Sequence, residues 1–346
     1  NGEEKQNDVP AMIINNRTFM PLRFIAENLG CKVDWNAESK EVTITYSDQS
    51  PIDESSYTSI PVVKKDITAI NVVAISAGGD YTVALKEDGT VVAWGINLFG
   101  QCNVPEGLNN VKAISAGYGH AVALKEDGTV VAWGDNDNGQ CSVPSDLAYV
   151  KMISAGGGHT TVLKEDGTVV AWGINSFGQC NVPDDLKNVK AISAGRYHTA
   201  VLTEEGEVIA WGRYCTSKKQ LLIESATMPC PLLEEHYEIP YPGKMIAISA
   251  GNEFTLALTE DGSVVDWSYS FYSSFIGEER FGNVKSISAG DKHIVRLKED
   301  GTVVAWGSNT MGQCDVPKSL NNVKEISAGE VHTVALKEDG TVVEWG

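Results

Sequence analysis

The tetrapeptide Ile-Ser-Ala-Gly occurs seven times in this chain of 346 residues. The copies begin at Ile75, Ile114, Ile153, Ile192, Ile248, Ile287 and Ile326. Consecutive copies start 39 residues apart, except for one interval of 56 residues after Ile192. A tryptophan stands 19 residues after each start. Seven copies of a unit of this size predict a repeat architecture, which is either an open solenoid or a closed ring.

The contents of one repeat favour the ring. Segments 111–116, 120–124 and 129–133 are rich in β-branched and small residues, which is typical of strands A, B and C of a sheet. Asp127-Gly128 predicts a type I′ hairpin turn between B and C, because both of its central positions need a positive φ. Residues 141–143 predict a short strand D that Pro144 ends. A radially repeated unit of four antiparallel strands is a propeller blade. We therefore predict an all-β, seven-bladed propeller.

The two ends of the repeat region predict how the ring closes. The last repeat stops at Gly346, directly after its strand C. One period before Trp94 lies the segment 55–66, which contains the strand-like run 57–63. We expect residues 57–63 to supply strand D of the last blade, because this would join the ends of the ring and remove an exposed sheet edge.

The consensus string His-Thr-Val-Ala-Leu-Lys-Glu-Asp-Gly-Thr-Val-Val-Ala-Trp-Gly, followed by Asn-x-x-Gly-Gln, resembles the regulator of chromosome condensation repeat. Its Ala-Leu-Lys, Ala-Trp-Gly and Gly-Gln-x-x-Val-Pro elements are similar to the bacterial branch that includes beta-lactamase inhibitor protein II. The resemblance covers about residues 55–346 and implies a seven-bladed propeller. Members are guanine-nucleotide exchange factors, enzyme inhibitors and surface proteins, so the resemblance implies no single function.

Residues 1–47 resemble a second family, the copper amine oxidase N-terminal-like domain, a small α+β module common on secreted proteins of Gram-positive bacteria. The resemblance rests on residues 13–30, 33–35 and 42–45. Leu22, Ile25 and Leu29 predict one apolar helix face, and strands are expected around residues 32–35 and 41–46. The expected organisation is this domain at 1–47, truncated at its start, a linker at 48–54 and the propeller at 55–346.

Neither family resemblance brings a metal site with it. No histidine precedes His120, and Cys31 alone cannot form a copper site. One repeat position holds His120, His159, His198, His293 and His332, and Tyr81 and Phe254 occupy it in the other two blades. A ring of imidazoles around a metal is one reading. The replacements by Tyr and Phe and the distance between blades favour side chains that pack and hydrogen-bond backbone groups. We expect no metal and no cofactor.

The repeated cysteines are expected to pack as small apolar side chains and not to take part in a reaction or a metal site. One repeat position, eight residues after the tryptophan, holds Cys102, Cys141, Cys180 and Cys314. Equivalent points on neighbouring outer strands are beyond disulfide reach, so we expect small apolar fillers. Cys215 and Cys230 lie in the 17-residue insertion behind the longer interval and are candidates for a disulfide.

The composition excludes several function classes. The formal net charge is −19, and five of the B–C turns read Lys-Glu-Asp, a surface that repels nucleic acid. No apolar run is long enough to span a membrane. No nucleophile elbow, His-Glu-x-x-His helix, phosphate loop or Cys-x-x-Cys pair occurs, so we expect no enzyme. The chain opens inside its first module, so we expect an export signal before residue 1 and a location outside the cell or at its surface.

Differences among the repeats predict where a partner binds. The B–C turn is nearly constant, whereas the A–B and C–D turns, which share the other face of an up-and-down blade, vary and carry aromatic and arginine residues typical of interfaces. We expect a monomer that recognises a protein partner through this face, for example as an inhibitor of a secreted enzyme. The alternative is a carbohydrate or cell-wall adhesion module that uses the exposed aromatic residues. The candidate partner-binding residues are Tyr81, Phe99, Tyr118, Phe177, Arg196, Tyr197, Tyr214, Asn252, Glu253, Tyr269, Phe271, Tyr272 and Met311.

Overall fold

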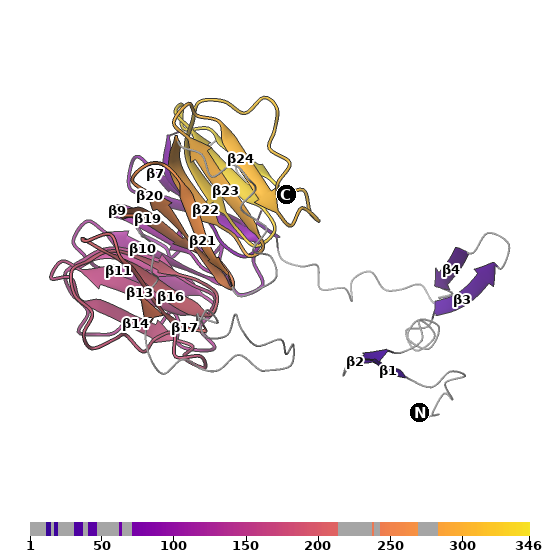
Figure 1. The fold of residues 1–346 in the computed structure, drawn as a ribbon, viewed down its shortest axis with the longest axis horizontal. Helices are drawn as coiled ribbons and strands as arrows, with labels where there is room; N and C mark the ends of the chain where they lie inside the picture. The colour runs from indigo at the N-terminus through magenta and orange to yellow at the C-terminus, as the bar shows by residue number, and fades with distance from the viewer. Residues whose placement is uncertain are drawn as a thin grey trace. The chain divides into compact units, whose positions relative to one another are not determined.

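The computed structural model describes the side chains of residues 71–213, 243–266 and 283–346. It also describes the backbone of residues 267–268 and of the short strands β1 (Met12–Ile14), β2 (Arg17–Phe19), β3 (Cys31–Asn36), β4 (Glu41–Tyr46), β5 (Val62–Val63) and β18 (Tyr237–Glu238). The chain divides into two compact units, Asn1–Ser59 and Ile60–Gly346. Figure 1 traces the strands of both units along the chain.

The first unit contains two antiparallel hairpins. β1 pairs with β2, and β3 pairs with β4 from Cys31 opposite Tyr46 to Asn36 opposite Glu41. The strands expected around residues 32–35 and 41–46 are therefore confirmed. The predicted helix over Leu22, Ile25 and Leu29 and the linker at 48–54 lie outside the described residues.

The second unit consists of seven antiparallel sheets, which we number as blades 1 to 7 in chain order. The inner strands A are β6 (Val72–Ala77), β9 (Val111–Ala116), β12 (Val150–Ala155), β15 (Val189–Ala194), β19 (Met245–Ala250), β22 (Val284–Ala289) and β25 (Val323–Ala328). The middle strands B are β7 (Tyr81–Lys86), β10 (His120–Lys125), β13 (His159–Lys164), β16 (His198–Thr203), β20 (Phe254–Thr259), β23 (His293–Lys298) and β26 (Thr333–Lys337). The outer strands C are β8 (Val91–Ile96), β11 (Val130–Gly134), β14 (Val169–Gly173), β17 (Val208–Gly212), β21 (Val264–Ser268), β24 (Val303–Gly307) and β27 (Val342–Trp345).

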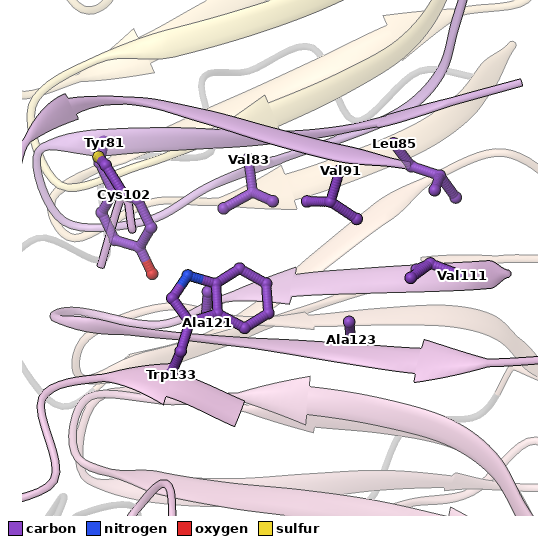
Figure 2. Packing of buried hydrophobic residues seen from close by; sticks show 9 residues of the cluster. All are labelled: Tyr81, Val83, Leu85, Val91, Cys102, Val111, Ala121, Ala123 and Trp133. Atoms are coloured by element: carbon purple, nitrogen blue, oxygen red, sulfur yellow. The ribbon is translucent and has the colours of Figure 1, made fainter. Parts of the chain in front are cut away.

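The core of the propeller lies between its blades. Each middle strand is buried along nearly its whole length, because a neighbouring blade covers each face of its sheet. Seven hydrophobic clusters result, one between each pair of neighbouring blades. Figure 2 shows the cluster between blades 1 and 2, in which Val83 and Val91 of the first blade face Val111 and Ala123 of the second.

The Ile-Ser-Ala-Gly repeat forms a closed ring of hydrogen bonds. The backbone N–H of Ala116 donates to Oγ of Ser76 in the preceding blade at 2.9 Å, and five further pairs repeat this bond. The seventh bond runs from the Ala77 N–H to Ser327 Oγ at 2.8 Å and joins blade 1 to blade 7. The cluster around Val72 and Leu336 packs across the same junction. The ring is therefore closed, and the solenoid is excluded.

The glycine of the tetrapeptide is required by close approach at the inner ends of the blades. A Cβ on Gly117 would lie 2.4 Å from the carbonyl oxygen of Gly156 in the next blade and 2.7 Å from the His120 ring. Gly78, Gly156 and Gly329 meet the same two obstacles, a neighbouring carbonyl and their own blade's ring. Any side chain here would force neighbouring blades apart.

The fourth strand predicted at residues 141–143 is absent. Asn136 Oδ1 accepts a hydrogen bond from the Cys141 N–H at 2.9 Å, and the Val143 N–H donates to the Cys141 carbonyl at 3.0 Å. These local bonds curl the backbone into turns, so it cannot extend along β11. Within the described residues, five blades have three strands. A fourth strand occurs only on blade 1, where it is β5, and on blade 4, where it is β18, within the described chain.

Among the described residues, the run 57–63 does not supply strand D of the last blade. Val62 and Val63, the two residues of the run 57–63 that the structure describes, pair with Ile96 and Gly95 of β8 in blade 1 and not with β27 in blade 7. The segment after β8 curls away, which leaves the outer edge of β8 open to this pairing. Blade 7 instead contacts blade 1 through its inner and middle strands, as every other neighbouring pair does.

The repeated histidines pack between blades, as expected, but their partner is a threonine hydroxyl. His120 Nε2 lies 3.0 Å from Thr160 Oγ1 of the next blade, and Thr160 Oγ1 donates to the Gln140 carbonyl at 2.8 Å, so the imidazole N–H is the donor to the threonine. Four further pairs repeat the contact: His159–Thr199, His198–Thr255, His293–Thr333 and His332–Thr82. Burial lowers the pKa of His120 to about 4.

Candidate functional site

The A–B and C–D turns lie on one face of the propeller, which we call the loop face. The Ile96 N–H, at the start of a C–D turn, donates to the carbonyl of Asp80 in the A–B turn at 2.9 Å. Phe99 in the C–D turn of blade 1 reaches the A–B turn of blade 2, where a Cβ on Gly119 would lie 3.0 Å from Cδ2 of Phe99. The variable turns of neighbouring blades therefore form one continuous surface.

The loop face carries most of the exposed large apolar side chains of the described residues. Leu98 is 57% exposed, Phe99 47%, Tyr118 39% and Met311 61%, whereas the remaining two, Tyr149 and Ile246, lie elsewhere. Leu98, Phe99 and Tyr118 belong to blades 1 and 2 and to turns that touch one another. Contiguous exposed apolar surface of this kind is typical of a contact site for another macromolecule.

Beside this apolar patch, arginine and aromatic side chains alternate in a row across three blades. The row consists of Tyr118, Arg196, Tyr197, Arg213 and Phe177. The guanidinium of Arg196 lies 4.7 Å from the Tyr118 ring centroid and 5.4 Å from that of Tyr197. Arg213 lies 5.4 Å from the Tyr197 ring and 5.1 Å from the Phe177 ring, and these two rings meet edge to face at 5.4 Å. We call this set the aromatic–arginine row.

Carboxylates from other blades hold both arginines in place. Arg196 Nη1 lies 3.0 Å from Asp291 Oδ1 and 3.6 Å from Glu330 Oε1, and Arg213 Nη1 lies 3.5 Å from Glu253 Oε1. Burial disfavours the charged form of Arg196, but its hydrogen bond to Asp291 and the nearby negative charge outweigh burial and raise its pKa. These contacts hold the row in one arrangement in the free protein, and a preorganised surface of this kind would lose less entropy on binding another molecule.

The row borders a funnel at the inner ends of the blades. One residue of each A–B turn lines its mouth: Gly79, Tyr118, Gly157, Arg196, Asn252, Asp291 and Glu330. The empty volume is about 470 Å³, which includes open solvent. Arg196 reaches from blade 4 to carboxylates on blades 6 and 7, so its side chain crosses the mouth.

Negative charge accumulates at this mouth. Burial raises the pKa of Glu330, and the neighbouring carboxylates of Asp291 and Asp80 raise it further, against the effect of Arg196. The pKa of Tyr118 is also raised, first by burial and then by Glu330. Burial is the first cause of both shifts, and the carboxylates at the mouth add to it against the opposing effect of Arg196.

The described histidines and cysteines do not form a catalytic pair. Burial raises the pKa of Cys102, Cys141, Cys180 and Cys314 to about 11, so these groups remain thiols at neutral pH. Each described histidine of the repeat uses Nε2 on a threonine of the next blade. Within residues 71–213, 243–266 and 283–346 no group of His, Cys, Asp and Glu could hold a metal ion. No helix in the described part of the chain is long and apolar enough to cross a membrane.

The structure brings four of the predicted site residues together: Tyr118, Phe177, Arg196 and Tyr197. Phe99, Asn252, Glu253 and Met311 lie on the same face. The prediction that Tyr81 contacts a partner is wrong. Tyr81 is 1% exposed, and its hydroxyl donates to the His120 carbonyl, because it occupies the buried position that histidine holds in most other blades. Tyr214, Tyr269, Phe271 and Tyr272 lie outside the described residues.

Three members of the site were missed in the sequence: Arg213, Asp291 and Glu330. Arg213 follows a Trp-Gly pair. Other described blades carry Ile96, Asp135, Ile174 or Ser308 at this position, so a long cationic side chain in one blade could have indicated the site from the sequence. Asp291 and Glu330 stand in variable A–B turns. Their role depends on Arg196 reaching across the ring, which a single repeat does not predict.

The opposite face has a different character. Six of its seven B–C turns repeat one hydrogen bond, in which Asp127 Oδ1, for example, accepts from the Thr129 N–H at 2.9 Å. Four of them also carry a lysine–aspartate pair, such as Lys125 Nζ at 3.5 Å from Asp127 Oδ2. The predicted type I′ turn is wrong. Gly128 has a φ of 84°, and its N–H donates to the Lys125 carbonyl at 3.0 Å, so the hairpin is a type I turn closed by a left-handed glycine. Uniform, solvated, acidic turns are typical of a solubilising surface.

Two family models match the chain. The copper amine oxidase N-terminal domain matches residues 1–94, and the regulator of chromosome condensation (RCC1) repeat matches residues 111–140, 150–179, 189–213 and 284–313. The repeat matches coincide with blades 2, 3, 4 and 6. No curated protein sequence matches the chain significantly.

Solved propellers resemble the structure. Prp20p from Saccharomyces cerevisiae is 20% identical with a TM-score of 0.61, and the match covers 78% of this chain and 84% of that one. Its structure was described together with its binding to Gsp1p and histones. The ectodomain of the receptor kinase ACR4 from Arabidopsis thaliana is 22% identical with a TM-score of 0.61, and covers 80% of this chain and 95% of its own. At such identities these similarities establish the fold alone.

Proposed function

Since the chain carries RCC1 repeats on a seven-bladed propeller behind a copper amine oxidase N-terminal domain, we propose that it is a non-enzymatic protein that binds a protein partner through its loop face. The observation that carries the proposal is the aromatic–arginine row. Tyrosine and arginine are enriched among the side chains that dominate the energy of protein interfaces. Tyrosine offers a large area with only two side-chain torsions, and both arginines of the row are already held by carboxylates.

The arrangement of the row favours a protein over a carbohydrate. Sugars stack on free aromatic faces, but Arg196 covers the Tyr118 ring, and Arg213 lies over the rings of Phe177 and Tyr197. The guanidinium groups still carry N–H donors at the surface, and Leu98 and Phe99 add apolar contact area next to them. A mixed apolar and hydrogen-bonding surface of this kind fits the centre of a protein interface.

Further parts of the proposal concern location and mode of action. We place the protein outside the cell or at its surface and treat it as a monomer, with the resemblance of residues 1–47 to modules of secreted proteins as the support. Inhibition of a secreted enzyme is the mode of action that a rigid, preorganised face suits best, because such a face can cover an active site without changing shape.

The proposal is tested by capture with matched variants. The full chain is immobilised and exposed to culture supernatant and to cell-wall extract of the source organism, beside an Arg196→Ala/Tyr197→Ala variant and a Glu126→Ala control on the opposite face. We expect a protein that the wild type and the control retain and the double variant loses. Retention of the same protein by all three would contradict the loop face as the site.

The carbohydrate alternative gives a different pattern. It requires a cell-wall polymer that binds wild type and the Arg196→Ala/Tyr197→Ala variant equally, and that is released when Tyr269, Phe271 and Tyr272 are replaced by alanine. Enzymatic degradation of the polymer during incubation would instead argue for an activity that the proposal excludes.

A further inference from the structure

The turns of the loop face differ in charge from one side of the ring to the other. The A–B and C–D turns of blades 1 and 2 contain three aspartates and no lysine or arginine. The described A–B and C–D turns of blades 3 and 4 contain two arginines and no aspartate or glutamate. The turns compared are residues 78–80, 97–100, 117–119 and 135–139 in the first pair of blades and residues 156–158, 174–178, 195–197 and 213 in the second.

The two sides also differ in whether their charges are paired. Arg196 and Arg213 both have carboxylate partners from other blades. Among the residues whose side chains the structure describes, no ion pair involves Asp80, Asp135 or Asp137. On the opposite face, four aspartates of the B–C turns have a lysine beside them. Blades 1 and 2 therefore present uncompensated negative charge on the loop face.

Two of these aspartates stand at one border of the apolar patch of Leu98, Phe99 and Tyr118. A Cβ on Gly119 would lie 3.0 Å from Cδ2 of Phe99 and 3.4 Å from Cβ of Asp135, so both side chains flank the same glycine. The Asp137 N–H donates to Asp135 Oδ1 at 3.0 Å, which holds the turn beside the patch. Asp137 itself is exposed.

The third aspartate stands at the opposite border of the patch. A Cβ on Gly79, the residue before Asp80, would lie 2.5 Å from the carbonyl oxygen of Tyr118. Burial is the first cause of the raised pKa of Tyr118, and both Glu330 and Asp80 raise it further, against Arg196. The two carboxylates therefore lie close to the Tyr118 hydroxyl. The apolar patch thus has acidic side chains on two sides.

An apolar surface with uncompensated carboxylates at its borders fits a cationic side chain with apolar neighbours. Lysine and arginine combine a charged head with an apolar stem, so the head can approach an aspartate while the stem packs on Phe99 and Tyr118. A cation over either ring gains a further attraction. An acidic segment would place like charges together, which costs binding free energy. The net charge of −19 disfavours a second copy of this chain for the same reason.

We propose that the protein partner seats a basic segment, a lysine or arginine between apolar side chains, on the apolar patch and the aspartates of blades 1 and 2. The proposal rests on the proposed function and adds which chemistry of the partner lies over which blades. Arg196 and Arg213 already have counter-charges, so an acidic segment of the partner gains less at blades 3 and 4 than a basic one gains at blades 1 and 2. The uneven charge of the loop face therefore fixes the orientation of the partner.

Two capped peptides that differ in one charge test this surface. They are acetyl-Leu-Arg-Leu-amide and acetyl-Leu-citrulline-Leu-amide, in which citrulline keeps the shape of arginine without its charge. Each is titrated into the isotopically labelled full chain, and the amide chemical shifts are followed by NMR. We expect the arginine peptide to shift the amides of Phe99, Tyr118 and Asp137 and to bind roughly fivefold more tightly than the citrulline peptide. Equal affinities, or larger shifts at the Arg213 amide than at these three, would overturn the proposal.

Two matched variants identify the responsible carboxylates. Asp80→Asn/Asp137→Asn removes two charges at nearly unchanged shape, and within the described residues neither carboxylate accepts a hydrogen bond, so this variant should fold as the wild type does. It should bind the two peptides equally. Glu126→Gln/Glu165→Gln removes the same net charge from the opposite face and should keep the preference for the arginine peptide. Equal loss of the preference in both variants would assign it to the net charge of the chain and refute the role of the aspartates.

The outcomes separate this proposal from the function on which it rests. A captured partner whose affinity does not change in the Asp80→Asn/Asp137→Asn variant would refute the basic segment, while protein binding by the loop face would stand. A preference for the arginine peptide at Phe99 and Tyr118, with no protein captured from supernatant or cell-wall extract, would support the basic segment and count against the proposed function alone.

Discussion

His332 in the last blade lies 3.2 Å from Thr82 in the first, Nε2 to Oγ1, across 250 residues of sequence. The same contact recurs between four other pairs of neighbouring blades. Where the histidine is missing, the threonine is missing too. Tyr81 faces a blade that carries Ala121, and Phe254 faces one that carries Ile294. The interfaces between blades therefore change in matched pairs.

Replacing a histidine and its threonine partner together should cost less stability than the two single replacements added together. Thr199→Ile should leave the buried N–H of His159 without its acceptor, which stands 3.0 Å away, and should cost about 1–3 kcal/mol of unfolding free energy. His159→Phe removes the donor alone. The double variant copies the Phe254–Ile294 interface, so we expect it to cost clearly less than the sum of the single variants.

Urea unfolding of the four proteins measures this coupling. A Phe254→His/Ile294→Thr exchange in the opposite direction serves as the control, since it should also be tolerated as a pair. Strictly additive losses at both interfaces would contradict the pairing.

Buried histidines should make the propeller sensitive to acid. Burial lowers the pKa of His120, His198 and His293 to about 4 and that of His159 to about 3. The unfolded chain binds these protons near the ordinary histidine value, so stability is complete above about pH 6.5 and falls as the pH drops towards 4. Each such group contributes about 3 kcal/mol over that window.

Denaturation midpoints between about pH 7.5 and about pH 5 check the sign and steepness of this fall. The His159→Phe/Thr199→Ile protein should take up one proton fewer on unfolding than the wild type. A flat profile over this window would contradict the burial of neutral imidazoles.

Much of this fold could be predicted from the repeat, because every blade packs against its neighbours in the same way. The same residue types therefore recur with a constant period. Ile75, Ser76 and their equivalents recur since each meets the same neighbours. The prediction of a fourth strand at residues 141–143 was wrong. The composition of this segment suits a strand, but the side chain of Asn136 accepts the Cys141 N–H and so satisfies the backbone locally. Local side-chain hydrogen bonds of that kind compete with strand pairing and carry no period of their own.

The candidate site was less accessible to sequence reasoning. Variation among turns indicated the loop face and named Tyr118, Arg196, Tyr197 and Phe177. Which side chains meet depends on the closed ring, because Asp291 and Arg196 are 95 residues apart and belong to different blades. The prediction for Tyr81 failed because tyrosine occurs at buried and at exposed positions of this propeller, as Tyr81 and Tyr118 show, and the residue type alone does not distinguish them.

Tyr149 should lower stability where it stands. It adopts a φ of 59°, a left-handed conformation in which the equivalent positions of blades 1, 2, 4, 6 and 7 use Asn71, Asn110, Asn188, Asn283 and Asn322. Its side chain is 77% exposed, so little packing offsets the strain. Tyr149→Asn should raise the unfolding free energy by about 1 kcal/mol, and Asn188→Tyr should lower it similarly, as thermal denaturation would show. No change in either variant would contradict this account.

Chelators should leave the protein unchanged. The described residues contain no group that could hold a metal ion, and their histidines and cysteines are committed to packing. We expect equal melting temperatures with and without a chelator in protein purified without added metal. A stoichiometric metal in that protein, or a lower melting temperature after chelation, would contradict the expectation.

The central claim, that the loop face recognises a protein partner through the aromatic–arginine row, is tested most directly by partner affinity. The dissociation constant of the captured partner is measured for wild type, Tyr197→Ala and Arg213→Ala, with Glu126→Ala and Glu165→Ala as controls on the B–C turns. We predict that each row variant loses about 1–3 kcal/mol of binding free energy at unchanged stability, while the controls bind as wild type does. Loss of affinity at Glu126 and Glu165 with full affinity at Tyr197 and Arg213 would contradict the claim.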